Sequence, residues 1–143
     1  MIYTANTKKA ILLAYRAHEN QVDKAGLPYI LHPVHLAEQM DTEEECMVAL
    51  LHDVVEDTDI TFEELEKEFP KTVIDALKLL THDKETDYME YIQKIKTNPI
   101  ATKVKLADLK HNSDTSRLDE ETIKKLNPEK RKKYEEAIQF LSK

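Results

Sequence analysis

The chain has 143 residues, which is the size of one domain with a substantial hydrophobic core. Its 41% hydrophobic and 34% charged residues exclude a disordered chain, and its net charge of −7 argues against nucleic-acid binding through a broad basic surface. The single Cys46 excludes an intrachain disulfide and suits a reducing cytoplasm. No apolar run is long enough for a signal peptide or a membrane-spanning helix. We therefore expect one cytoplasmic domain over residues 1–143, with no membrane or nucleic-acid partner.

Helix-forming residues dominate the sequence. One Gly and five Pro leave little material for hairpins, and long segments rich in Ala, Leu, Glu and Lys predict an all-α bundle of about six to eight helices. Thr42 and Thr61 each precede a Glu by three residues, which is the capping-box signature of a helix start. Asn98–Pro99 and Asn127–Pro128 start two further helices. In chain order, the predicted helices cover residues of about 4–19, 33–40, 42–58, 61–69, 70–80, 87–95, 98–113 and 127–141.

The stretch Cys46–Thr58, with the sequence CMVALLHDVVEDT, is apolar on nearly every face and is therefore expected to be a buried helix. Four polar residues interrupt it. On one continuous helix, His52 and Glu56 would be neighbours at i and i+4, and so would Asp53 and Asp57. Buried carboxylates are normally paired or bound to a metal, and no Lys or Arg lies within the segment. We therefore predict a bound cation with His52 and Asp53 as adjacent ligands; the alternative is that the polar residues only mark the exposed end of the helix.

A second polar stripe lies on the penultimate predicted helix. Lys105, Asp108 and Asn112 follow one face at i, i+3 and i+7, and Thr115 would join them if the helix continued. Such a stripe is more often a solvated surface, but beside the central carboxylates it would supply a fourth metal ligand, Asp108, and substrate contacts. His32, placed just before the second predicted helix, is free to point inward. Two His and two Asp ligands suit Mn, Fe, Zn or Mg, with open positions for water.

These residues occur in the order H…HD…D, which resembles the pattern of the HD-domain metal-dependent phosphohydrolases. The surrounding segments PYILHP, ALLHDVVEDT and KLADLKHN resemble the hydrolase domain of the RelA/SpoT homologues, which include the stand-alone small alarmone hydrolases. The matching motifs run from Gln21 to Thr115. The resemblance implies a single all-α HD domain that holds one divalent ion, usually Mn²⁺ in that family. The ligands that it implies are His32, His52, Asp53 and Asp108.

The resemblance also implies a reaction, namely hydrolysis of the 3′-diphosphate of (p)ppGpp to give GDP or GTP and pyrophosphate. Glu56 and Asp57 match the family's catalytic pair, which positions or activates the attacking water. No synthetase activity is expected, because the chain stops before a nucleotidyl-transfer domain would fit. A small-molecule nucleotide is the expected partner. The positions that match nucleotide contacts in the family are Lys24, Tyr29, Lys105, Asn112 and Thr115.

One position departs from the family pattern, which usually has Arg-Lys where this chain has Asp23–Lys24. An Asp there would repel a polyanion. Two other interpretations therefore stay open: a phosphohydrolase of another nucleotide or phosphoester, and a non-catalytic module that senses a nucleotide. The basic run Lys130–Lys133 is expected to be a solvated face, with phosphate binding as the alternative. We expect structural or solvent-facing roles for the remaining histidines, of which His35 is the reserve ligand: His18, His35, His82 and His111.

Overall fold

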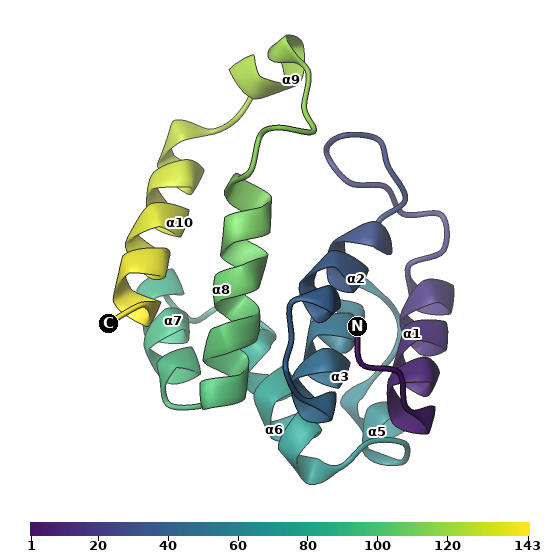
Figure 1. Ribbon diagram of the computed structural model, residues 1–143. Coiled ribbons are helices and arrows are strands. Elements are labelled where there is room, and N and C mark those ends of the chain that lie inside the picture. The colour runs from purple at the N-terminus through teal and green to yellow at the C-terminus, as the bar shows by residue number, and fades with distance from the viewer.

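The computed structural model describes residues 1–143, and all of its regular secondary structure is helical. The helices, drawn in Figure 1, are α1 (Ala5–Ala17), α2 (Leu31–Glu38), α3 (Glu43–Leu51), α4 (Val54–Asp57), α5 (Phe62–Glu66), α6 (Lys71–Leu80), α7 (Tyr88–Lys96), α8 (Pro99–Ser113), α9 (Glu120–Lys124) and α10 (Pro128–Leu141). Seven of the ten have eight or more residues, which confirms the predicted all-α bundle, and the short ones are α4, α5 and α9. None of them combines the length and the apolar composition that crossing a bilayer requires.

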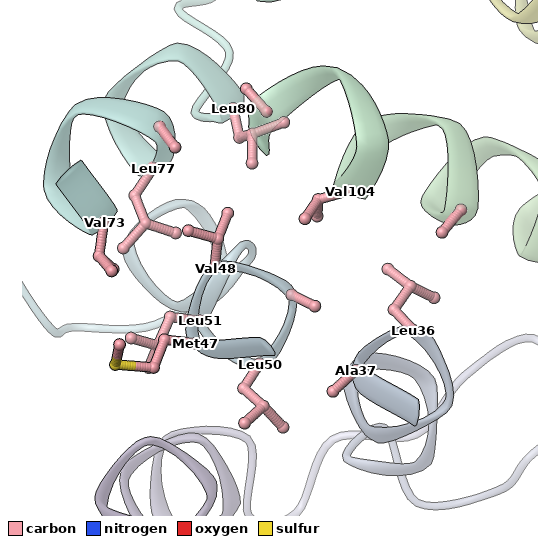
Figure 2. Packing of buried hydrophobic residues seen from close by; sticks show 14 of the residues in the cluster. Leu36, Ala37, Met47, Val48, Leu50, Leu51, Val73, Leu77, Leu80 and Val104 are labelled. Carbon is pink, nitrogen blue, oxygen red and sulfur yellow. The ribbon is translucent and has the colours of Figure 1, made fainter. Parts of the chain in front are cut away.

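Helix α3 lies at the centre of the bundle and packs against α1, α2, α6 and α8. All residues from Cys46 to Leu51 are buried, so this part of α3 has no solvated face. Figure 2 shows Val48 directed toward α6 and α8, and Leu50 directed to the opposite side. A helix that is apolar all round is stable only when neighbours cover every face, and here four helices do so. The first part of the central stretch is therefore buried, as the sequence predicts, whereas Glu56 and Asp57 near its end are exposed.

Most predicted helix starts are confirmed. Asn127 caps α10 by accepting from the Glu129 N–H. The predicted capping box of α3 is only half formed, because Glu45 accepts from the Asp41 N–H instead of the N–H of its cap. Helix α9 was not predicted, since its five residues are too few to show a periodic pattern. The three other predicted caps each accept a hydrogen bond from the backbone N–H three residues further on, and they are Thr42, Thr61 and Asn98.

The central stretch is not one helix, because the chain breaks between α3 and α4. Asp53 at the break has φ −106° and ψ 1°. The His52 ring donates from Nδ1 to the Ala49 carbonyl at 2.7 Å. In a continuous helix the Asp53 N–H would use that carbonyl, so the side chain takes the place of a backbone hydrogen bond. The expected i, i+4 pairing of His52 with Glu56 on one helix is therefore wrong.

Two other helix boundaries differ from the predicted ones, and both differences change where candidate site residues lie. Helix α2 begins at Leu31, so His32 lies in its first turn rather than before it. Helix α8 ends at Ser113, so Thr115 lies beyond the helix and does not extend the polar stripe. Asn20 has φ 75°, so the chain makes a left-handed turn after α1, which Asn tolerates. The loop that follows returns the chain to α2 at the same end of the bundle as the segment after α8 (Figure 1).

Truncating a side chain on the central helix should test this packing. Leu50 is fully buried, whereas Leu12 on α1 is 55% exposed. Leu50→Ala is expected to lower the free energy of unfolding by about 2–5 kcal/mol, because it removes apolar contacts and leaves a cavity. Leu12→Ala, the control, should change it by less than about 0.5 kcal/mol. Urea unfolding followed by circular dichroism measures both, and equal losses would contradict the central position of α3.

Candidate metal centre and substrate pocket

Four side chains that are distant in the sequence meet where α2, α8 and the α3–α4 break converge. Each offers one ligand atom, and these atoms all lie within 4.8 Å of one another. Three of the four residues are buried, and the Asp53 side chain is 19% exposed. The tertiary structure therefore brings together all of the metal ligands that the sequence suggested, which are His32, His52, Asp53 and Asp108.

Ring nitrogens and carboxylate oxygens of this cluster face one another. Nε2 of His32 lies 2.9 Å from Oδ1 of Asp108. Nε2 of His52 lies 2.9 Å from Oδ2 of Asp53 and 3.5 Å from Oδ1 of Asp108, and it is buried without a hydrogen-bond partner. Because Nδ1 of His52 donates to the Ala49 carbonyl, only Nε2 is left to face the two carboxylates, and a positive charge is needed there, either the ring's own proton or a bound cation. A divalent ion between these groups supplies that charge, so the donor set fits one.

The pKa values of the residues in the cluster also indicate that positive charge is needed beside the carboxylates. Burial lowers the pKa of His52, but the carboxylates of Asp53 and Asp108 raise it well above its ordinary value. Burial raises the pKa of Asp108, yet the charge of Lys105, the hydrogen bond with His32 and the nearby His52 ring hold it well below its usual range. The site therefore keeps a buried carboxylate ionised and needs positive charge beside it.

Three predicted substrate residues contact the ligand carboxylates directly. Lys105 lies 3.0 Å from Oδ2 of Asp108, and the Asn112 amide donates to Oδ1 of the same carboxylate at 3.0 Å. The Tyr29 hydroxyl donates to Oδ2 of Asp53, and burial together with that carboxylate raises the pKa of Tyr29, so the hydroxyl keeps its proton. In this structure, these residues orient the carboxylates of two candidate ligands, as supporting groups of metal sites do.

A cavity of about 220 Å³ opens beside the cluster, between the α1–α2 loop and the segment after α8. Lys24 and Asn112 line it, and both also line a smaller adjoining depression. Thr115 lines the depression together with basic residues of α10. All of the predicted substrate residues except Lys105 therefore border one of these two spaces.

The two predicted catalytic carboxylates follow the break and stay partly solvated. Carboxylate oxygens of Asp53, Glu56 and Asp57 lie within 4.8 Å of one another. Oε1 of Glu56 accepts from the His82 backbone N–H at 2.7 Å, which fixes one end of that carboxylate. Burial and the neighbouring charges of Asp53 and Glu56 raise the pKa of Asp57 to about 6. Asp57 can therefore gain or lose a proton close to neutral pH.

Two residues that border the site were not predicted from the sequence. Nδ1 of His111 lies 2.7 Å from Nδ1 of His32, and the two rings stack. Arg117 donates from Nη1 to Nε2 of His111. The spacing of three residues from Asp108 places His111 on the same helical face and was an available signal, whereas Arg117 lies in an irregular segment without one. His35, the reserve ligand, lies beside His111 and outside the cluster.

Comparisons with known proteins agree with this geometry. A family model described as HD domain matches residues 10–126. The bifunctional (p)ppGpp synthase/hydrolase SpoT of Escherichia coli (strain K12) is 36% identical over 141 residues, which cover 88% of this chain. A guanosine-3′,5′-bis(diphosphate) 3′-pyrophosphohydrolase of Danio rerio is 39% identical over 122 residues, which cover 76% of this chain. A solved structure of a metazoan orthologue of SpoT has a TM-score of 0.67 and 24% identity, covering 98% of this chain and 97% of the other.

The lengths of these proteins differ widely. The matched region is 19% of the E. coli SpoT protein and 68% of the Danio rerio protein, and the likeness to the solved structure shows the shared fold. The family match extends over most of the chain and includes all four residues of the cluster. The chain therefore belongs to the HD domain family and is related to the guanosine-3′,5′-bis(diphosphate) 3′-pyrophosphohydrolases.

Proposed function

We propose that the protein is a metal-dependent phosphohydrolase that removes the 3′-diphosphate of (p)ppGpp, giving GDP or GTP and pyrophosphate. The observation that carries this proposal is the largely buried set of two His and two Asp beside two adjoining spaces bordered by basic residues. The relatives named above are hydrolases of this substrate by name. The proposal treats residues 1–143 as one catalytic domain.

We propose one divalent ion, Mn²⁺, as the cofactor. The unpartnered Nε2 of His52 and the ionised carboxylate of Asp108 support a cation at this position. When bound, a divalent ion polarises a phosphoryl oxygen and lowers the pKa of water. Lys105 and Asn112 hold Asp108 in place, so the protein fixes the geometry before any ligand arrives. The proposed ligands are His32, His52, Asp53 and Asp108.

In this proposal, Glu56 and Asp57, the two carboxylates after the break, each carry out one of the proton transfers. The His82 N–H occupies one oxygen of Glu56, which leaves the other free to orient or deprotonate the attacking water. Asp57, with its pKa raised to about 6, carries a proton in part of the population near neutral pH and can give it to the leaving oxygen. Asp57 is the proposed acid, and Glu56 is the proposed base.

A local excess of positive charge supports a substrate with several phosphates. Lys24, Lys130 and Arg131 line the smaller depression, and none of them forms an ion pair with a carboxylate. Burial lowers the pKa of Lys24, as does the charge of Lys130. A bound polyanion would relieve this repulsion. The expected solvated face of α10 therefore includes two residues that border the pocket.

Removing one proposed ligand should remove the metal. His52→Ala is expected to weaken Mn²⁺ binding by more than about 100-fold, because changes in supporting residues alone cost about 10- to 100-fold. His35→Ala removes a nearby ring outside the cluster and should leave the affinity unchanged. Isothermal titration of the chelator-treated protein with Mn²⁺ measures both variants. Equal affinities in the two variants would place the ion elsewhere.

Turnover can be tested separately. The protein with Mn²⁺ should convert ppGpp to GDP and pyrophosphate in equal amounts, and Asp53→Ala should lose both bound metal and turnover. Ion-exchange chromatography of the products distinguishes pyrophosphate from orthophosphate. Release of orthophosphate from ppGpp would contradict the proposed reaction. Activity only on other nucleotides would show that the alarmone is not the substrate. Nucleotide binding without turnover would indicate a sensing module instead.

The raised pKa of Asp57 predicts a pH-dependent stability difference. Its folded-state pKa of about 6 lies above the ordinary 3.8, so the wild-type protein loses stability as pH rises through this interval. Asp57→Asn carries no such loss, so the variant should be increasingly more stable than wild type as pH rises to about 6, with a constant advantage above that. Urea unfolding in the presence of a chelator, from pH 4 to pH 8, measures this difference. Asp59→Asn, at an exposed neighbouring site, is the control, and a pH-independent difference would argue against the assignment.

A further inference from the structure

The α1–α2 loop presents a fixed carboxylate to the cavity beside the metal cluster. Oδ1 of Asp23 accepts from the backbone N–H groups of Ala25 and Leu27 at 2.9 and 3.0 Å. These bonds close the turn and fix the side chain, which is only 12% exposed. Oδ2 is left for a partner from elsewhere in the chain, and it lies 3.9 Å from Nη2 of Arg117. Asp23 therefore has one oxygen for its own loop and one for Arg117.

Arg117 reaches this cavity from the segment between α8 and α9. Its Nη1 donates to Nε2 of His111, and its Nε is buried without a hydrogen-bond partner. A guanidinium carries five N–H donors, so much of its capacity is unused here. The contact with Asp23 is a single long one rather than a bidentate pair. Such a contact is weaker than the two-point bond that a guanidinium makes with phosphate.

The other charged residues around the cavity determine whether Arg117 is available to a ligand. The charged residues that line the space are Asp23, Lys24, Asp114 and Arg117. Asp114 accepts from the Ser116 N–H in its own turn and is exposed, so it does not compete with Asp23 for the guanidinium. A phosphorylated ligand that enters the cavity therefore meets a guanidinium whose only carboxylate partner is 3.9 Å away.

We propose that Arg117 binds a phosphate group of the substrate, and that Asp23 is a positioning residue that holds the guanidinium at the cavity until the phosphate replaces it. This inference rests on the proposed function. It names Arg117 as a residue that contributes to the affinity for a nucleotide polyphosphate. It also gives Asp23 a role beyond repelling a polyanion, because the guanidinium of Arg117 balances the charge of the Asp23 carboxylate. The pair links two segments that are far apart in the sequence and lie at the same end of the bundle (Figure 1).

Opposite effects of two substitutions test the proposal. Asp23→Asn keeps the Oδ1 acceptor for the loop and removes the charge that competes for Arg117, so KM for ppGpp should fall by about threefold or more at unchanged kcat. Arg117→Ala should raise KM by about tenfold or more at unchanged kcat, since it removes a charge-assisted hydrogen bond to substrate. Arg117→Lys keeps the charge and should recover part of the loss. Arg16→Ala, an exposed arginine on α1, is the control and should leave both constants unchanged.

Binding of inorganic pyrophosphate separates this inference from the proposed function. Isothermal titration in the presence of the same divalent ion should give the tightest binding for Asp23→Asn, then wild type, then Arg117→Ala. That order without any ppGpp hydrolysis would support the inference and overturn the proposed reaction. Hydrolysis without that order would overturn the inference alone.

Two further results would also overturn it. If both Asp23→Asn and Arg117→Ala raised KM, the pair would be a structural brace rather than a competitor for substrate. If Arg117→Ala had no effect while Asp23→Asn lowered KM, Asp23 would act by repulsion alone. Urea unfolding of each variant checks that the folded state persists, and Arg117→Lys provides a second test if Arg117→Ala unfolds.

Discussion

The ionised carboxylate of Asp108 is the constraint on which the rest of the site depends. It is buried, and an unpaired charge in that position would cost several kcal/mol. The fold therefore surrounds it with groups that favour its charge. Oδ2 meets the Lys105 ammonium, and Oδ1 meets the Asn112 amide and the rings of His32 and His52. Helices α2 and α8 and the α3–α4 break must all be in register for these contacts to form at once.

The break between α3 and α4 connects core packing with chemistry. Helix α3 is packed by apolar contacts on every face, and these contacts hold its C-terminal end in place. The His52 ring ends the helix there by taking the Ala49 carbonyl, and the same hydrogen bond fixes which ring nitrogen faces the carboxylates. Asp53 follows in a non-helical conformation beside it. One local interaction therefore terminates the helix and sets the orientation of two candidate ligands.

In the proposed reaction, the cavity beside the cluster brings together residues that would serve different parts of a phosphorylated substrate. The cluster lies on one side of it, with Glu56 and Asp57 beside Asp53. Basic residues from three segments border the other side, and in the proposed reaction they would offset the charge of phosphates away from the reacting bond. The chain has a net charge of −7, but Lys24, Lys130 and Arg131 give the smaller depression a local excess of positive charge that would favour such a polyanion.

The helical class and most helix starts followed from the sequence alone, because caps and apolar periodicity are local signals. His52 and Asp53 were conspicuous as polar residues in an apolar segment, and the H…HD…D resemblance added His32 and Asp108 to the candidate ligands. The sequence did not determine the helix break, because a periodic pattern cannot show that the His52 side chain would take a backbone acceptor. Only the tertiary structure showed that Tyr29 and Lys105 bond to ligand carboxylates. It alone also paired Asp23 with Arg117, since contacts between residues 94 positions apart depend on how the helices pack.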